Sequence, residues 1–413
     1  MKEIKLKGLE QSCYTKTLKN GLDIILIPYE DKKNYFITYA TRYGSDINSF
    51  VPEGAKKGIT VPNGIAHFLE HKVFVQKDGL QPEEFYAMSG GISNAYTTFR
   101  NTSYLFYSTE SLEENINYLL DYVQNIYLTD ESVESEKGII TEEIHMYEDR
   151  PSEVLAEKIR FNTLNTNPYR DSIIGTTENI NSITKEDLET CYYTFYNPSN
   201  MFMVVTGNFD PEKIMSVIKE NQSKKNFESL SNIKIKEFKE DNKVYKEKEI
   251  INIPTNVPKV AYTLKIPLDN INLSRRKLHL YTYILFTTLF DETSLFDENI
   301  KKEGIVNNTT YVSLLNTNTH LLVSFVNETN KYDEFLDKVK NRISVLEVSK
   351  DDFERKKKVL ISNEIFAYEN IENVNDIIID NIIYHGKLED NPIEIIEKMM
   401  KMDFCHMHGP EHH

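Results

Sequence analysis

A stretch rich in lysine and glutamate at residues 226–250 divides the chain into two parts, and each part combines short apolar runs with amphipathic segments. The stretch has no sustained apolar periodicity, which is typical of a solvated linker with room for one strand. On either side of it, apolar runs predict strands, and apolar residues spaced three or four apart predict helices. This mixture, with strands leading in both parts, predicts the α+β fold class.

The predicted elements follow a similar order in the two parts. In the first part we expect strands at 23–27, 35–41, 92–99, 103–108 and 201–206, and helices at 65–74, after Pro82, at 112–126, at 131–147, from Lys185 and from Pro211. In the second part we expect a strand at 260–266, a helix at 273–290, strands near 311–315 and 321–326, and helices up to Met402. The similar order predicts two related lobes, each a mostly antiparallel sheet covered by helices.

The length of 413 residues suits two large domains or three small ones. We therefore expect a first lobe at 1–225, a linker at 226–250 and a second, related lobe at 251–404. The tail at 405–413 contains Cys405, His406, His408, His412 and His413. These side chains could form a metal cluster, but a truncated purification tag at 411–413 is the simpler interpretation, and the tail is left out of the predicted function.

The composition excludes several classes of protein. With 64 acidic against 48 basic side chains, the net charge of −16 argues against a protein that binds nucleic acid through its phosphates. The three cysteines, Cys13, Cys191 and Cys405, are odd in number and lack a CxxC spacing. Neither a disulfide framework nor a thiolate zinc site is therefore expected, and a reducing cytoplasm is the predicted location. No apolar stretch approaches the ~20 residues that cross a bilayer, so no membrane insertion is expected.

The segment His67-Phe-Leu-Glu70-His71 carries the clearest chemical signal. Two histidines four residues apart, with a glutamate between them, project from one face of a helix. Two imidazoles in this arrangement can bind one zinc ion, and the carboxylate lies close enough to act on a water molecule without being a ligand. The alternative is an amphipathic helix with two exposed histidines and an ion-paired glutamate.

An inverted HxxEH motif needs a third protein ligand from elsewhere in the chain. The helix predicted at 131–147 contains Glu136 and Glu143, which are seven residues apart and so share a face, whereas Glu142 points about 100° away. Glu143 is therefore the better candidate ligand, and Glu136 is a candidate for orienting a histidine ring or the reactive water. Spacing alone also allows each of these glutamates to be a solvated surface charge.

Four blocks of sequence together resemble the M16 zinc peptidases, the family of pitrilysin, insulysin and the mitochondrial processing peptidase. They run from Gly64 to Phe74, from Ser93 to Thr97, from Glu136 to Asp149, and from Phe195 to Met201 followed by Gly207-Asn208. The blocks occur in family order within the first ~210 residues, and the chain is most similar to short bacterial members with two lobes.

The resemblance implies one Zn²⁺ per chain, bound by His67, His71 and Glu143. It also implies that Glu70 is the general base and that Glu136 supports the site. Asn94 and Ala95 would then lie on an edge strand that receives the backbone of a peptide substrate. The implied activity is that of a metalloendopeptidase, which hydrolyses peptides enclosed between the lobes.

The second part departs from the family pattern. Members that use both halves of the site carry an arginine and a tyrosine seven residues apart around a Gly-Leu pair. Here Gly304-Ile305 matches that pair, but Ile300 and Asn307 stand at the two functional positions. Tyr311 is either a displaced substitute or a tyrosine of a strand core. We therefore expect a paralogous M16-like partner chain that supplies the missing half in a heterodimer. The alternative function is a non-catalytic scaffold or a peptide-binding subunit.

Overall fold

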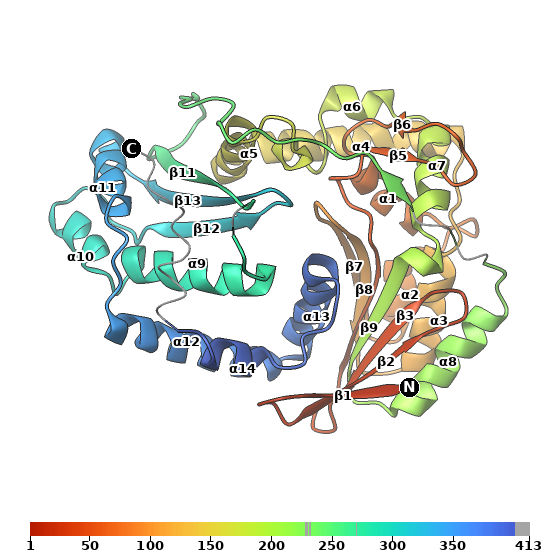
Figure 1. Ribbon diagram of the computed structural model, residues 1–413. Helices are drawn as coiled ribbons and strands as arrows, with labels where there is room; N and C mark the ends of the chain where they lie inside the picture. The colour runs from red at the N-terminus through yellow and green to blue at the C-terminus, as the bar shows by residue number, and fades with distance from the viewer. Residues whose placement is uncertain (228–229, 231–232, 270, 401–413) are drawn as a thin grey trace. The chain divides into compact units, whose positions relative to one another are not determined.

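The computed structural model describes residues 1–227, 230, 233–269 and 271–400 (Figure 1). The predicted tail cluster at 405–413 therefore lies outside the described residues. The chain forms two compact units, and each is built from separated segments. Unit 1 comprises residues 1–145, 171–237 and 366–391, and unit 2 comprises 146–170, 238–365 and the described residues from Pro392 onward.

Unit 1 contains a seven-stranded sheet with the order β1-β2-β3-β9-β4-β8-β7. Its strands are β1 (Lys2–Leu6), β2 (Gln11–Thr17), β3 (Asp23–Pro28), β4 (Tyr35–Thr41), β7 (Ile92–Thr97), β8 (Thr102–Ser108) and β9 (Met201–Gly207). All neighbouring strands are antiparallel except β3 and β9, which are parallel. The sheet is therefore mostly antiparallel, as predicted. The strand β9 is buried throughout, whereas β7 forms the edge next to β8.

Helices complete unit 1, and some of them contact its sheet (Figure 1). They are α1 (Ile65–Phe74), α2 (Pro82–Met88), α3 (Leu112–Val123), α4 (Asp130–Glu148), α6 (Thr177–Ser182), α7 (Lys185–Phe195), α8 (Pro211–Ser223) and α13 (Ile371–His385), with a short 3₁₀ turn, η2, at Pro198–Asn200. The helix α4 continues three residues beyond the boundary of the unit at His145. The predicted helix at 65–74 and the predicted strand at 35–41 match α1 and β4 at both ends.

The helix α13 comes from far along the chain yet belongs to unit 1. Its buried Val374 and Ile378 share a hydrophobic core with Ile27 of β3 and Val204 of β9. The Asn375 side chain also donates to the backbone oxygens of Phe36, at 3.1 Å, and Val204, at 3.3 Å. The expected second lobe at 251–404 therefore differs from the compact unit 2. The helix α13 falls within that range, but its apolar face is buried on the sheet of unit 1.

Unit 2 contains a three-stranded antiparallel sheet with the order β11-β13-β12. Its strands are β11 (Lys259–Pro267), β12 (Tyr311–Asn316) and β13 (His320–Glu328). Its helices are α5 (Pro151–Thr163), α9 (Arg275–Phe290), α10 (Leu295–Lys302), α11 (Tyr332–Ile343), α12 (Lys350–Tyr368), which extends past its boundary, and α14 (Pro392–Glu397), with the 3₁₀ turn η1 at Pro168–Arg170. The core lies between α9 and the sheet, where Phe286 and Phe290 contact Phe325.

The segment at 226–250 is only partly the solvated linker that its composition indicates. It contains one short strand, β10 (Lys234–Ile235), which pairs with β5 (Ser49–Val51), and β5 pairs with β6 (Ile59–Thr60). Glu240 is 8% exposed, because its carboxylate accepts hydrogen bonds from a backbone turn. No helix in the described part of the chain is long and apolar enough to cross a membrane.

Candidate metal centre

The first half of the candidate site lies on α1. Its apolar residues Ile65, Phe68, Leu69 and Val73 are buried, and this leaves His67 and His71 one turn apart at the margin of the core. The helix begins after Gly64, whose φ of +88° favours glycine. A side chain there would also stand 2.4 Å from the Ile174 backbone oxygen, so the start of the helix is fixed by close packing.

The second half of the site lies on α4. Buried Val133, Ile140 and Ile144 fix the orientation of this helix. As a result, Glu136 and Glu143 point to the side of α1, whereas Glu142 is exposed. The two glutamates that share a helix face are therefore the ones that lie next to the histidines.

The structure brings His67, His71 and Glu143 together. One ligand atom from each of the three side chains lies within 4.8 Å of the others. The Glu143 Oε2 atom is 3.8 Å from His67 Nε2 and 3.5 Å from His71 Nε2. The Glu136 carboxylate lies behind His71, with Oε1 at 3.0 Å from Nδ1. Two imidazoles and one carboxylate form a donor set of the kind that binds zinc in catalytic sites.

The pKa shifts of His67, His71 and Glu143 are those expected of side chains that can bind a cation. Burial and the neighbouring His71 lower the pKa of His67 to about 4, so His67 offers a neutral ring. Burial opposes protonation of His71, but hydrogen bonds to Glu136 and Glu143 outweigh it and raise the pKa of His71 to about 9. The hydrogen bond with His71 lowers the pKa of Glu143. Without a metal, His71 therefore carries a proton between two carboxylates, and a bound cation would replace that proton.

Glu70 is near the cluster but is not one of the three grouped ligands. It is 9% exposed, and its Oε2 accepts a hydrogen bond of 2.5 Å from the Thr97 hydroxyl of β7. Burial raises the pKa of Glu70, and the hydrogen bond from Thr97 opposes that rise. A buried carboxylate with a raised pKa is suited to accept a proton and to return it.

Asn94 and Ala95 lie on β7, an edge strand of the described sheet, and the family resemblance implied an edge strand at this position. Asn94 is exposed, and its side-chain oxygen accepts a hydrogen bond of 2.9 Å from the Ala95 backbone N–H. Ala95 shares a strand face with Thr97, because side chains two residues apart point the same way. The same strand thus presents an edge and contacts Glu70.

Sequence reasoning missed two residues, Thr97 and Lys72. Thr97 lies inside one of the quoted blocks, and its contact with Glu70 follows from the strand β7 packing against α1. Lys72 follows His71 directly, and it lies three and four residues after Leu69 and Phe68, so it interrupts the apolar face of the helix. Such an interruption on a buried helix was the available signal, because a lysine enclosed by apolar residues needs a partner.

The residues of the second part that depart from the family pattern differ in their burial. Ile300 is 1% exposed and belongs to the core of unit 2. Asn307 is exposed. Tyr311 is 67% exposed at the start of β12, so the interpretation as a tyrosine of a strand core is wrong. The side chain lies at the end of its strand, where the core no longer covers it.

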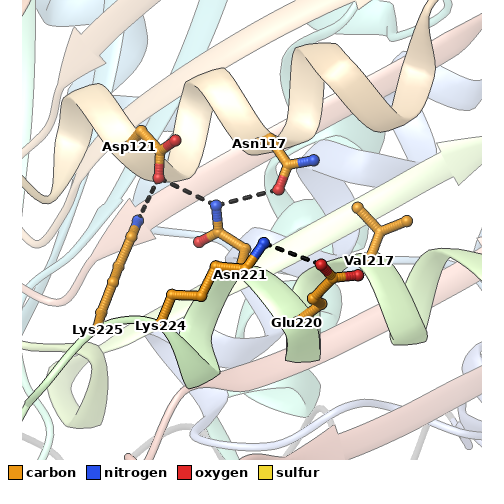
Figure 2. A pocket seen from close by; sticks show the side chains of 7 residues that line it. All are labelled: Asn117, Asp121, Val217, Glu220, Asn221, Lys224 and Lys225. Atoms are coloured by element: carbon orange, nitrogen blue, oxygen red, sulfur yellow. Dashed lines mark hydrogen bonds and ion pairs between the residues drawn. The ribbon is translucent and has the colours of Figure 1, made fainter.

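A separate cavity of about 460 Å³ lies between α3 and α8 (Figure 2). Its lining residues are Asn117, Asp121, Val217, Glu220, Asn221, Lys224 and Lys225. The charged groups pair with one another, since Lys225 contacts Asp121 at 2.7 Å and Lys224 contacts Glu220 at 2.9 Å. None of the candidate catalytic residues lies in this lining, so the cavity is distinct from the metal centre.

Two family models match adjoining parts of the chain. The model described as insulinase, peptidase family M16, matches residues 45–177, and the model described as peptidase M16 inactive domain matches residues 182–360. The chain is 38% identical to the zinc protease YmfH of Bacillus subtilis over 311 residues, which cover 75% of this chain and 72% of that protein.

More distant relatives and solved structures agree. A probable mitochondrial-processing peptidase subunit beta of Arabidopsis thaliana is 29% identical over 49% of this chain and 37% of its own length. The crystal structure of an M16-like peptidase from Alicyclobacillus acidocaldarius superposes with a TM-score of 0.91 at 29% identity, and covers 97% of this chain and 96% of that one. A protease from Helicobacter pylori has the same fold, with a TM-score of 0.80 at 18% identity over 96% and 95% of the two chains.

These matches define a two-lobe α+β fold of the kind found in M16-like peptidases. The chain belongs to the M16 family of peptidases.

Proposed function

We propose that this chain is a zinc-dependent endopeptidase subunit, in which His67, His71 and Glu143 hold one zinc ion and Glu70 is the general base. The observation that carries the proposal is the convergence of the three ligand atoms within 4.8 Å, with a buried carboxylate on the same helix turn. Relatives named zinc proteases support the choice of metal. Zinc, when bound, makes a water molecule more acidic and polarises a carbonyl oxygen.

The side chains of this protein divide the remaining work. Glu70 takes a proton at Oε1, because Oε2 is already held by the Thr97 hydroxyl, and it returns the proton to the leaving amine. Glu136 holds the His71 ring through Nδ1 and so keeps Nε2 directed toward Glu143. Asn94 and Ala95, on the edge strand β7, pair with the backbone of the peptide substrate.

We further propose that a paralogous M16-like chain completes the site in a heterodimer. The positions expected to hold an arginine and a tyrosine hold Ile300, which is buried in an apolar core, and exposed Asn307. Loss of one oxyanion donor typically costs about 10²–10³ in rate, so the chain alone should be a poor catalyst. A cytoplasmic location is part of the proposal and rests on the cysteines, of which Cys13 and Cys191 are free and buried.

Metal analysis and peptide digestion test the proposal together. The purified chain should bind about one zinc per chain, and E70Q should keep the metal but lose cleavage. E143Q should lose most of the metal, because a ligand charge is removed. The chain mixed with a paralogue from a neighbouring gene should cleave peptides about 100-fold faster than the chain alone. Full activity of the isolated monomer would contradict the heterodimer.

The alternative is a non-catalytic scaffold or peptide-binding subunit, which the missing arginine and tyrosine favour. Such a subunit would bind zinc and peptides but would show no chelator-sensitive cleavage, with or without the paralogue. Mass spectrometry of the digest distinguishes the two functions, and it also identifies the cleavage site.

A further inference from the structure

Lys72 is a buried cation directly beside the candidate metal centre. It is 1% exposed, although its neighbours Leu69 and Val73 on α1 are apolar core residues. Its ammonium donates to Glu136 Oε2 at 3.2 Å and to the Ser132 backbone oxygen at 3.0 Å. Burial of an ammonium is costly unless the group is paired and hydrogen-bonded, so these two contacts account for its position.

The Glu136 carboxylate connects Lys72 to the site. Its Oε2 atom contacts the Lys72 ammonium, while its Oε1 atom contacts His71 Nδ1 at 3.0 Å. A carboxylate held at both oxygens cannot rotate without breaking a contact. The Lys72 ammonium is in turn fixed to the backbone of α4 by Ser132. A continuous set of contacts therefore runs from the backbone of α4 through Lys72 and Glu136 to the ring of His71.

We propose that Lys72 is a positioning residue for the metal ligand His71. It fixes the Glu136 carboxylate, and that carboxylate fixes the His71 ring so that Nε2 faces Glu143 at 3.5 Å. This inference rests on the proposed function, because it assumes that His71 binds zinc. It goes beyond that function by assigning a role to a side chain that is neither a ligand nor in contact with one.

Two effects of removing the ammonium oppose each other. The loss of a positive charge near a dication favours zinc binding, but the loss of a fixed carboxylate disfavours it. The pairing at 3.2 Å already cancels most of the field of the ammonium at the metal. Without Lys72, the buried Glu136 carboxylate would keep only one neutral donor, the His71 ring. A buried charge with so little compensation is costly, so the carboxylate should turn toward solvent, away from His71. The loss of positioning should therefore dominate.

Chelator competition on the full chain measures the zinc affinity directly. We expect K72M to bind zinc at least 10-fold more weakly than the wild type, as is typical when a partner of a metal-bound histidine is lost. K137M is the matched control, because Lys137 on α4 also pairs with a glutamate and a backbone oxygen but does so away from the histidines. It should bind zinc as the wild type does.

A double-mutant cycle with E136Q separates positioning from a general effect on folding. If Lys72 acts through Glu136, K72M should weaken zinc binding by less than about 3-fold when E136Q is already present. K72Q, which keeps a neutral donor of shorter reach, is the second variant if K72M does not fold, and it should also bind zinc more weakly. Circular dichroism of each metal-free variant verifies that it is folded.

The outcomes have separate meanings. Wild-type affinity or tighter binding in K72M, or in K72Q where K72M does not fold, overturns the inference. Full additivity of K72M and E136Q also overturns it, because Lys72 would then act independently of Glu136. If the wild-type chain itself binds no zinc, the proposed function fails, and the inference fails with it. The wild-type measurement therefore distinguishes the two failures.

Discussion

A single hydroxyl holds the candidate general base. Glu70 lies on a helix and Thr97 on a strand, and their hydrogen bond of 2.5 Å links the two elements at the reacting group. A charged carboxylate gains more from such a bond than a neutral group does. Thr97 should therefore influence the rate of cleavage rather than the binding of metal.

Replacement of Thr97 by valine tests this role. Valine keeps the shape but removes the donor, so we expect kcat to fall about 10-fold while zinc content and KM change little. T97S keeps the hydroxyl and should restore most of the rate. The measurement is steady-state cleavage of a peptide by whichever preparation is active, alone or with the partner. Equal kcat values for T97V and T97S would contradict the assigned role.

Residue spacing within one helix is enough to predict which side chains share a face, but not which faces of two helices meet. His67 and His71 are one turn apart, and Glu136 and Glu143 are two turns apart, so each pair faces one side. The contacts of Thr97 and Lys72 cannot be predicted from residue spacing, because they depend on how a strand and a second helix pack against α1. Residues of that kind become apparent only when the elements are assembled.

At the scale of elements, α13 shows how a helix far along the chain completes a sheet. Its apolar face covers β9 and β4, and the Thr206 hydroxyl donates to the Ile371 backbone oxygen at 2.9 Å. The sequence predicts helices in this region from apolar periodicity, but periodicity does not identify which sheet receives the apolar face. For this reason the element was predicted and its partner was not.

Truncation of Ile378 measures the contribution of α13. The side chain is completely buried, and I378A should lower the free energy of unfolding by about 2–5 kcal/mol. I365A is a matched control, because Ile365 is 41% exposed on α12 and its truncation should cost less than about 0.5 kcal/mol. Urea unfolding followed by circular dichroism gives both values. A similar cost for the two variants would show that α13 packs weakly.

At the scale of the whole molecule, Glu240 joins separated segments of unit 2. Its carboxylate accepts hydrogen bonds of 2.7–2.8 Å from the backbone N–H groups of Asn165, Thr166 and Asn167. It also contacts the ammonium of Lys265 on β11 at 2.6 Å, where both side chains are almost fully buried. Burial alone would raise the pKa of Glu240, but these donors outweigh it and lower the pKa to about 2.

Replacement of Glu240 by glutamine should destabilise the protein by about 3 kcal/mol at pH 7, because Lys265 is left buried without its counter-charge. In the wild type the folded pKa lies below the unfolded value of about 4.3. The stabilisation is therefore complete above about pH 4.3 and disappears as the pH falls toward 2. Urea unfolding of E240Q and wild type across this range should give a difference that shrinks with acidity.

The variant E247Q serves as the control in the same segment, since Glu247 is exposed. Its stability should stay within about 0.5 kcal/mol of the wild type at every pH. A stability difference for E240Q that does not change with pH would contradict the role of its charge. The composition of 226–250 predicted a solvated linker because charged residues dominate it, and composition does not reveal that one of those charges is buried.

The origin of α13 has a consequence for synthesis of the protein. The last strand of the large sheet ends at Gly207, but α13 ends at His385. At roughly 5–20 residues per second, a ribosome needs on the order of 10–40 s to make the intervening chain. During that interval the apolar face of the newly made sheet lacks the helix α13 that covers it in the folded protein. Cellular chaperones are therefore expected to engage the nascent protein at this stage.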